Sequence, residues 1–220
     1  MPDDRSLADF VASVAATNLP PSGGAVSAHT AALSSALTQM VSAITIGRKR
    51  FASVDAEMRV VVARAAELVA TLSALADRDA AACAAMHAAY KLPADTEQRT
   101  AERSRAIAAA MLTASEVPLE IARRSAEACA LAAIAAEKGN PNALADATVA
   151  ALLAEASCRG AAYTVRMNVG VLGDRALATR YAEEAIALVR QAARSASRAT
   201  AQAERAIGAD PEAPPAPPPR

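Results

Sequence analysis

The chain has very few aromatic residues, with no Trp, three Tyr and two Phe among 220 residues. A core without large rings must be filled by small and branched aliphatic side chains, which requires elements that approach closely. Alanine, with 64 copies, has the highest helix propensity and is depleted in strands. The composition therefore argues against a β-sandwich or barrel and predicts a single all-α domain of long Ala-rich helices.

Net charge is also absent, because 23 basic residues balance 23 acidic ones. A protein that neutralises a phosphate backbone or an anionic membrane surface needs an excess of positive charge. We therefore expect neither a nucleic acid nor a membrane as a partner.

Cysteine and histidine are scarce. Cys83, Cys129 and Cys158 lie in apolar helical patterns without a C-x-x-C pair, and His29 and His87 are too far apart for an H-E-x-x-H motif. We expect no metal site, buried structural thiols and a reduced, cytoplasmic chain. The two histidines are expected at helix-packing or surface positions.

No export signal is apparent, because the first residues, Met-Pro-Asp-Asp-Arg, are acidic where a secretory signal is basic. Residues 10–47 contain no Asp, Glu, Lys or Arg and precede Arg48-Lys49-Arg50, which superficially imitates a membrane span with its flank. However, Ser, Thr, His and Gln are spread through residues 24–47. This pattern is typical of a buried helix in a soluble bundle.

Proline and glycine divide the chain into segments with helical periodicity. The predicted helices, with a junction near Pro118, span residues 4–18, 24–46, 53–89, 96–112, 117–137, 142–168 and 174–207. Residues 208–220 are rich in proline, and we expect a disordered or polyproline-like tail outside a domain at 1–207.

The most informative pattern is an apolar stripe interrupted by a carboxylate. Spacings of three and four place Leu68, Leu72, Leu75, Asp79, Cys83, Met86 and Tyr90 on one helix face. A buried carboxylate must be paired, hydrogen-bonded or neutral with a raised pKa. Asp79 is therefore either a candidate for acid/base chemistry or half of an internal ion pair with an Arg from another helix. Periodicity alone does not separate the two.

Other polar residues are candidates with ordinary alternatives. Asp146 lies in a first helical turn, where a carboxylate also suits the helix dipole. Asn168 is either a polar ligand group or a helix C-cap. The cluster Arg48-Lys49-Arg50 follows a helix C-terminus, where positive charge is favourable by itself, but it could equally hold the carboxylates of an anionic ligand.

Several segments together resemble a known family. The loop Pro21-Ser22-Gly23-Gly24-Ala25-Val26-Ser27-Ala28 is similar to the P-G-G-G-[SA]-x-[AS]-A loop of the formiminotransferase-cyclodeaminase C-terminal family, which includes stand-alone methenyltetrahydrofolate cyclohydrolases. Further similar segments follow in order: Thr45-Ile46-Gly47-Arg48-Lys49-Arg50-Phe51, Asp77-Arg78-Asp79, Tyr90-Lys91-Leu92-Pro93, Val117-Pro118-Leu119, Ala136-Glu137-Lys138-Gly139-Asn140-Pro141-Asn142, and Asp146 with Asn168. The resemblance covers about residues 5–205.

The resemblance implies an up-and-down helical bundle that forms a homodimer and binds a folate in a cleft near the glycine loop. The family's catalytic aspartate falls on Asp79. The implied activity is hydrolysis of 5,10-methenyltetrahydrofolate to 10-formyltetrahydrofolate, or alternatively release of ammonia from 5-formiminotetrahydrofolate. A non-catalytic folate-binding member, and a helical scaffold or granule-coating protein, remain as other classes.

The resemblance also implies a set of substrate-binding residues, with no metal or other cofactor. These are Gly23, Gly24, Arg48, Lys49, Tyr90, Asn140, Asp146 and Asn168. The chain departs from the family pattern at three places: Ser22 replaces the first loop glycine, Ala25 replaces a frequent serine, and Ala147-Thr148 replaces Ala-Gly. Because serine has less backbone freedom than glycine, Ser22 suggests a loop of different shape.

Overall fold

The computed structural model describes residues 6–17 and 20–208. Within these residues all of the regular secondary structure is helical, joined by short turns and loops. The α-helices are α1 (Leu7–Ala15), α2 (Gly23–Ala43), α3 (Asp55–Tyr90), α4 (Glu97–Lys138), α5 (Leu144–Asn168) and α6 (Arg175–Gly208), with 3-10 turns η1 (Lys49–Val54), η2 (Pro141–Ala143) and η3 (Val169–Val171). The all-α prediction is confirmed. The predicted tail, apart from Gly208, lies outside the described residues.

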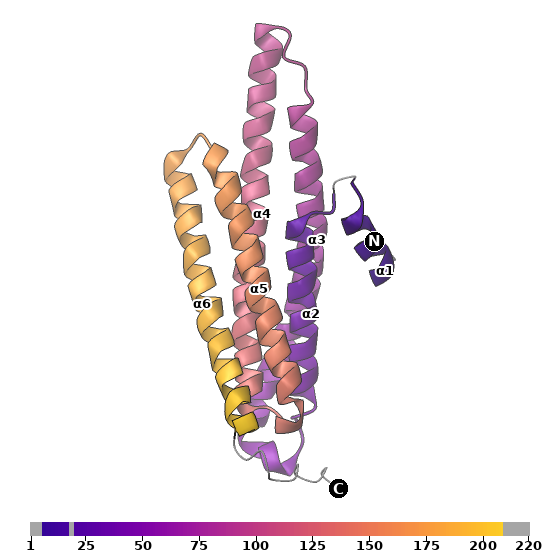
Figure 1. Ribbon diagram of the computed structural model, residues 1–220, viewed down its shortest axis with the longest axis vertical. Helices are drawn as coiled ribbons and strands as arrows, with labels where there is room; N and C mark the ends of the chain where they lie inside the picture. Colours follow the sequence, from indigo (N-terminus) through magenta and orange to yellow (C-terminus); the bar gives the residue numbers. More distant parts are fainter. Residues whose placement is uncertain (1–5, 18–19, 209–220) are drawn as a thin grey trace.

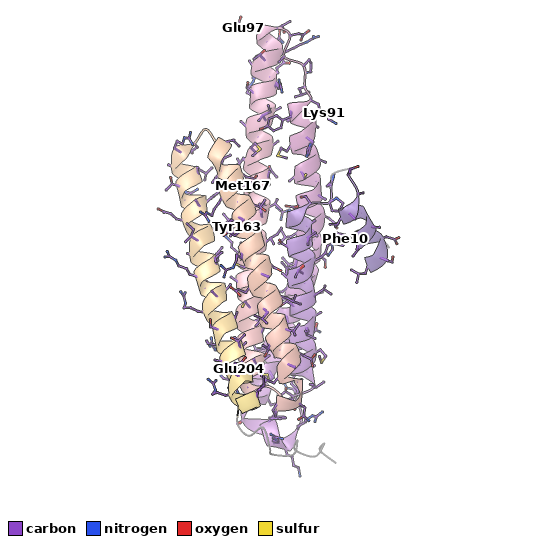
Figure 2. The ribbon with its side chains drawn as sticks, viewed as in Figure 1. Phe10, Lys91, Glu97, Tyr163, Met167 and Glu204 are labelled. Carbon is purple, nitrogen blue, oxygen red and sulfur yellow. The ribbon has the colours of Figure 1, made fainter. Side chains whose placement is uncertain are left out.

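Helices α2 to α6 form an up-and-down bundle (Figure 1). Successive helices are antiparallel, so α2, α4 and α6 run in one direction and α3 and α5 in the other. The hairpin of α3 and α4 projects beyond the ends of the other helices, with Lys91 and Glu97 near its tip (Figure 2). The short helix α1 lies against the outside of α2 and α3, where the Phe10 ring meets His29 edge-on at 4.5 Å.

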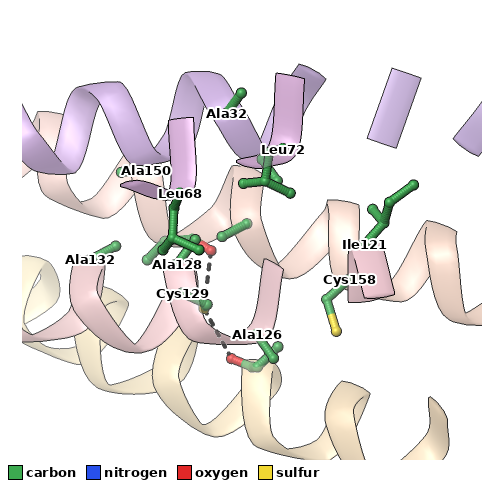
Figure 3. Packing of buried hydrophobic residues seen from close by; sticks show 14 of the residues in the cluster. Ala32, Leu68, Leu72, Ile121, Ala126, Ala128, Cys129, Ala132, Ala150 and Cys158 are labelled. Atoms are coloured by element: carbon green, nitrogen blue, oxygen red, sulfur yellow. Dashed lines mark hydrogen bonds between the residues drawn. The ribbon is translucent and has the colours of Figure 1, made fainter. Parts of the chain in front are cut away.

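Alanine fills the centre of the bundle, as the composition predicts. The main core cluster combines alanines from α2, α3, α4, α5 and α6 with Leu68, Leu72 and Ile121 (Figure 3). Side chains this small let backbones approach, and the buried hydroxyl of Ser34 on α2 donates to the Ala150 carbonyl of α5 at 2.7 Å. Cys129 and Cys158 are buried, and burial raises the pKa of each thiol to about 12. Both therefore remain protonated and act as small apolar side chains.

The predicted junction near Pro118 is wrong, because α4 continues through Pro118 from Glu97 to Lys138. Proline has no N–H, so it leaves the carbonyl of Ala114, four residues earlier, without its helical donor. The side-chain amide of Asn168 supplies the missing bond, with Nδ2 at 2.6 Å from that carbonyl. A residue at the end of α5 thus allows a proline in the middle of α4.

We predict that Asn168→Ala lowers the free energy of unfolding by about 1–2 kcal/mol, since it leaves the buried Ala114 carbonyl unsatisfied. Urea denaturation measures this loss. In a Pro118→Ala background the residue at 118 donates its own N–H, so the same Asn168→Ala change should cost much less. Equal costs in the two backgrounds would show that the Asn168 bond does not compensate for the proline.

Candidate active site

Asp79 is buried on α3, with 6% of its surface exposed, level with the N-terminus of α2. The leucines that precede it on the stripe are buried between α2 and the rest of the core. Its carboxylate accepts a hydrogen bond from the backbone N–H of Ala25 and another from the Ser22 hydroxyl, whose Oγ lies 3.4 Å from Oδ2. Among the described residues Asp79 forms no ion pair, so the internal ion pair that the sequence left open is not what the structure adopts.

Gly24 allows the carboxylate to lie directly on the first turn of α2. A Cβ atom built on Gly24 would come 2.1 Å from Oδ1 of Asp79 and 2.4 Å from its Cγ, so any side chain at this position would force the carboxylate to move. A Cβ on the adjacent Gly23 meets nothing within 4 Å. Asp79 therefore occupies the position of an anion at a helix N-terminus, where the free amides and the helix dipole favour negative charge.

The surroundings of Asp79 act on its pKa in opposite directions. Burial, the largest effect, raises the pKa above the ordinary 3.8, whereas the Ala25 amide and the Ser22 hydroxyl lower it, and the net change is upward. Cys83, one turn further along α3, is half-buried beside the same Ser22 hydroxyl, and burial raises the pKa of its thiol. A carboxylate shifted toward neutral pH can both accept and return a proton during one reaction.

Three other predicted residues lie toward the Asp79 end of the bundle. Gly23 begins α2. Asn168 ends α5 with its amide bonded to Ala114. Tyr90 ends α3 and is 46% exposed. It is eleven residues beyond Asp79, which corresponds to about 16 Å along a helix, so only an extended ligand could touch both.

The remaining four predicted residues lie at the opposite end of the bundle. Arg48 and Lys49 are exposed in the turn after α2. The backbone N–H of Asn140 donates to Thr45 Oγ1 at 2.9 Å in the same region, and Asp146 lies in the first turn of α5. Helix α2 has 21 residues, so this end is about 30 Å from Gly24. One copy of the chain does not bring the predicted site residues together.

Two neighbours of Asp79, Ser22 and Cys83, have surroundings that the sequence does not predict. The φ of Ser22, −127°, is an extended conformation that any residue adopts, so serine fits this position without backbone strain. Its hydroxyl contacts the Asp79 carboxylate, a contact that the sequence does not predict. Cys83 was expected to be a buried filler, yet it is half-buried next to the same group. The signal available for Cys83 was its spacing, four residues after Asp79 on one face.

In the described part of the chain, no group of three or more His, Cys, Asp and Glu side chains is arranged to hold a metal ion. In the same residues, no helix combines the length and apolar character needed to cross a membrane.

These features define a class of protein: an up-and-down helical bundle with a buried acid at a helix N-terminus. The sequence profile of the formiminotransferase-cyclodeaminase family matches residues 6–187. The chain therefore belongs to this family, which confirms the resemblance seen in its loop and D-x-D segments.

The comparisons also identify individual relatives. A methenyltetrahydrofolate cyclohydrolase of Methylorubrum extorquens is 36% identical over 192 residues, which cover 87% of this chain and 92% of that protein. The formimidoyltransferase-cyclodeaminase of Rattus norvegicus is 42% identical over 95 residues, which are 43% of this chain and 18% of the rat protein. The crystal structure of a formiminotetrahydrofolate cyclodeaminase from Thermotoga maritima superimposes with a TM-score of 0.83 at 26% identity, covering 93% of this chain and 98% of that chain.

We predict that Gly24→Ala displaces the Asp79 carboxylate, because the new methyl group takes its place on the first turn of α2. The expected stability loss, from forced repacking, is about 1–3 kcal/mol. Thermal unfolding measures it, with Gly23→Ala as the matched control. That control adds the same methyl group to open space, and it should be neutral or slightly stabilising. Equal losses in the two variants would contradict a direct contact between Gly24 and Asp79.

Proposed function

We propose that the chain hydrolyses 5,10-methenyltetrahydrofolate to 10-formyltetrahydrofolate, reversibly, with Asp79 as the general acid and base. The observation that carries the catalytic assignment is the buried carboxylate of Asp79, held on the N-terminus of α2 with a raised pKa and no ion-pair partner among the described residues. The relative from Methylorubrum extorquens, whose length the chain nearly covers, supports the choice of reaction.

The hydrolysis needs one group that moves a proton twice. Water attacks the cationic methenyl carbon between N5 and N10 and loses a proton to the ionised Asp79 carboxylate. The carbon then carries a hydroxyl group. As the bond from this carbon to N5 breaks, N5 takes the proton that Asp79 returns and the hydroxyl group loses its own proton to solvent, which gives the 10-formyl product and restores the carboxylate. A carboxylate with a pKa raised toward neutral is suited to both transfers.

The runner-up is a formiminotetrahydrofolate cyclodeaminase, which the structural likeness to the Thermotoga maritima protein supports. In that reaction N10 attacks the carbon of the protonated formimino group, and the same aspartate takes the N10 proton and delivers it to the NH2 group, which departs as ammonia and leaves the methenyl cation. Family membership argues against the scaffold or granule-coating alternative.

Neither reaction requires a metal or a second cofactor. We further propose that the protein is cytoplasmic and forms a homodimer.

The direct test is to follow the disappearance of 5,10-methenyltetrahydrofolate absorbance with the purified protein. We expect hydrolysis well above the buffer rate, and a loss of at least about 100-fold in kcat for Asp79→Asn, because general acid–base groups contribute rates of this order. Asp77→Asn, which changes an exposed carboxylate two residues away, is the matched control and should retain activity.

Each outcome separates the alternatives. A wild-type protein that does not exceed the buffer rate contradicts the hydrolase proposal, and conversion of 5-formiminotetrahydrofolate alone supports the runner-up. Full activity in Asp79→Asn contradicts the catalytic assignment even if the reaction is correct.

A further inference from the structure

A groove with several arginines runs between α5 and α6, two helices that lie side by side (Figure 1). Its volume is about 230 Å³. Sites that enclose a whole drug-sized ligand have about 300–1,000 Å³, so this groove suits the charged end of a molecule. The lining residues with polar or large apolar side chains are Arg159, Tyr163, Arg166, Ile186, Val189 and Arg190.

Elsewhere in the bundle, arginines between two helices are paired with glutamates of the facing helix. Arg123 of α4 donates to both carboxylate oxygens of Glu184 on α6, at 2.6 and 2.9 Å. Arg198 of α6 donates in the same way to Glu137 on α4, at 2.8 and 2.5 Å. The α5–α6 groove instead has arginines on both of its helices, and in the described part of the chain no ion pair joins α5 to α6.

The groove keeps an excess of positive charge after its local pairs are counted. Arg159 is bonded to Glu155, one turn earlier on α5. Arg166 and Arg190 have no ion-pair partner among the described residues. Glu183 is two turns before Arg190 on α6, but it is exposed and does not line the groove. Two guanidinium groups therefore face the same concavity without an acid between them, an arrangement that an anion would stabilise.

The side chains of the groove indicate what kind of anion fits. Guanidinium groups bind carboxylate and phosphate oxygens through paired hydrogen bonds. The Arg166 guanidinium lies 5.7 Å from the centre of the Tyr163 ring, which is 57% exposed. Ile186 and Val189 add an apolar wall on α6. An exposed ring beside an apolar wall favours contact with another ring, so the groove suits negative charges attached to an aromatic group.

We propose that this groove binds an organic dianion whose charges lie next to an aromatic ring, with Arg166 and Arg190 holding the charged oxygens. Two sources share this chemistry: the p-aminobenzoylglutamate part of a folate, which rests on the proposed function, and a separate aromatic phosphate, which does not. A Cβ on Gly160 of α5 would lie 3.0 Å from Ser27 Oγ, so the groove is level with the first turns of α2. It lies across α5, which is about 10 Å wide, from the Asp79 end of that helix.

Calorimetric titration with p-aminobenzoylglutamate and with phenyl phosphate tests the groove. We expect at least one of them to bind with a Kd of about 1 mM or lower, and Arg166→Gln/Arg190→Gln to weaken it at least about tenfold, because bonds to charged groups are lost. Arg175→Gln/Arg194→Gln is the matched control, since it removes the same charge from two exposed arginines of α6 outside the groove. Failure of both compounds to bind, or an equal loss in the two double variants, would overturn the proposal.

Kinetics of the same variants distinguish the two sources. If the groove holds the folate's own tail, Arg166→Gln/Arg190→Gln raises the KM for 5,10-methenyltetrahydrofolate about tenfold or more and leaves kcat unchanged, because the contact is made equally in the ground and transition states. If it holds a separate phosphate, the KM does not change and phenyl phosphate binds in the presence of substrate. A wild type without folate activity contradicts the proposed function, whereas the calorimetric result decides the groove on its own.

A second inference, which rests on the proposed hydrolysis, comes from Ser22, at the position where the family loop has glycine. Its hydroxyl lies 3.4 Å from Oδ2 of Asp79. We infer that Ser22 is a positioning residue, which holds this carboxylate from the N-cap of α2. The other influences on the carboxylate are the Ala25 amide and burial, with no charged side chain of the described residues among them. A neighbouring titratable group is the Cys83 thiol on α3, and α2 has no Asp, Glu, Lys or Arg, while its one histidine, His29, contacts α1.

The pH dependence of kcat/KM for hydrolysis tests this role. A donor to the ionised carboxylate stabilises that form, so Ser22→Ala raises the pKa of Asp79 further and should move the acid limb of the profile to higher pH by about half to one unit. Ser22→Thr keeps the hydroxyl and should keep the wild-type profile. Ser27→Ala, which removes a hydroxyl bonded to the Gly23 carbonyl, is the matched control. An unmoved acid limb in Ser22→Ala contradicts this role, whereas an inactive wild type contradicts the proposed function instead.

Discussion

The contact between the Asp79 carboxylate and the first turn of α2 is the interaction on which the candidate site depends. It combines two features that cost stability separately, a buried acid and the free amides of a helix N-terminus. Each satisfies the other, because the Ala25 N–H and the helix dipole favour the charged form that burial disfavours. The carboxylate therefore has a raised pKa. It lies directly on the first turn of α2 because Gly24 has no side chain to occupy that space.

Small side chains make this arrangement possible throughout the bundle. With alanine at most core positions, backbones approach closely enough for side chains to bond to carbonyls of other helices, as Ser34 does to Ala150 and Asn168 does to Ala114. The second of these bonds lets α4 pass through Pro118 without a break.

Much of the fold could be predicted from the sequence, and the site only in part. The Asp79 stripe could be predicted because burial on a helix imposes a period of 3.6 residues. The end of the helix at Gly47 could be predicted because glycine commonly follows a helix in a left-handed conformation, and Gly47 has a φ of 77°. The continuity of α4 was not visible, because the donor that replaces the proline N–H comes from a residue 50 positions later in the chain. The role of Ser22 was hidden for the same reason, since its partner is 57 residues away.

By itself, the sequence determined the all-α class, the apolar faces of the helices, the special position of Asp79 and the resemblance to its family. These depend on local propensity, periodicity and short motifs, which one chain segment carries alone. The tertiary structure decided that Asp79 bonds to a helix N-terminus instead of an arginine, that Asn168 supports a proline, and that the basic turn lies a helix length from the acid. Each of these depends on which segments the bundle places side by side, and antiparallel packing joins residues that no local pattern connects.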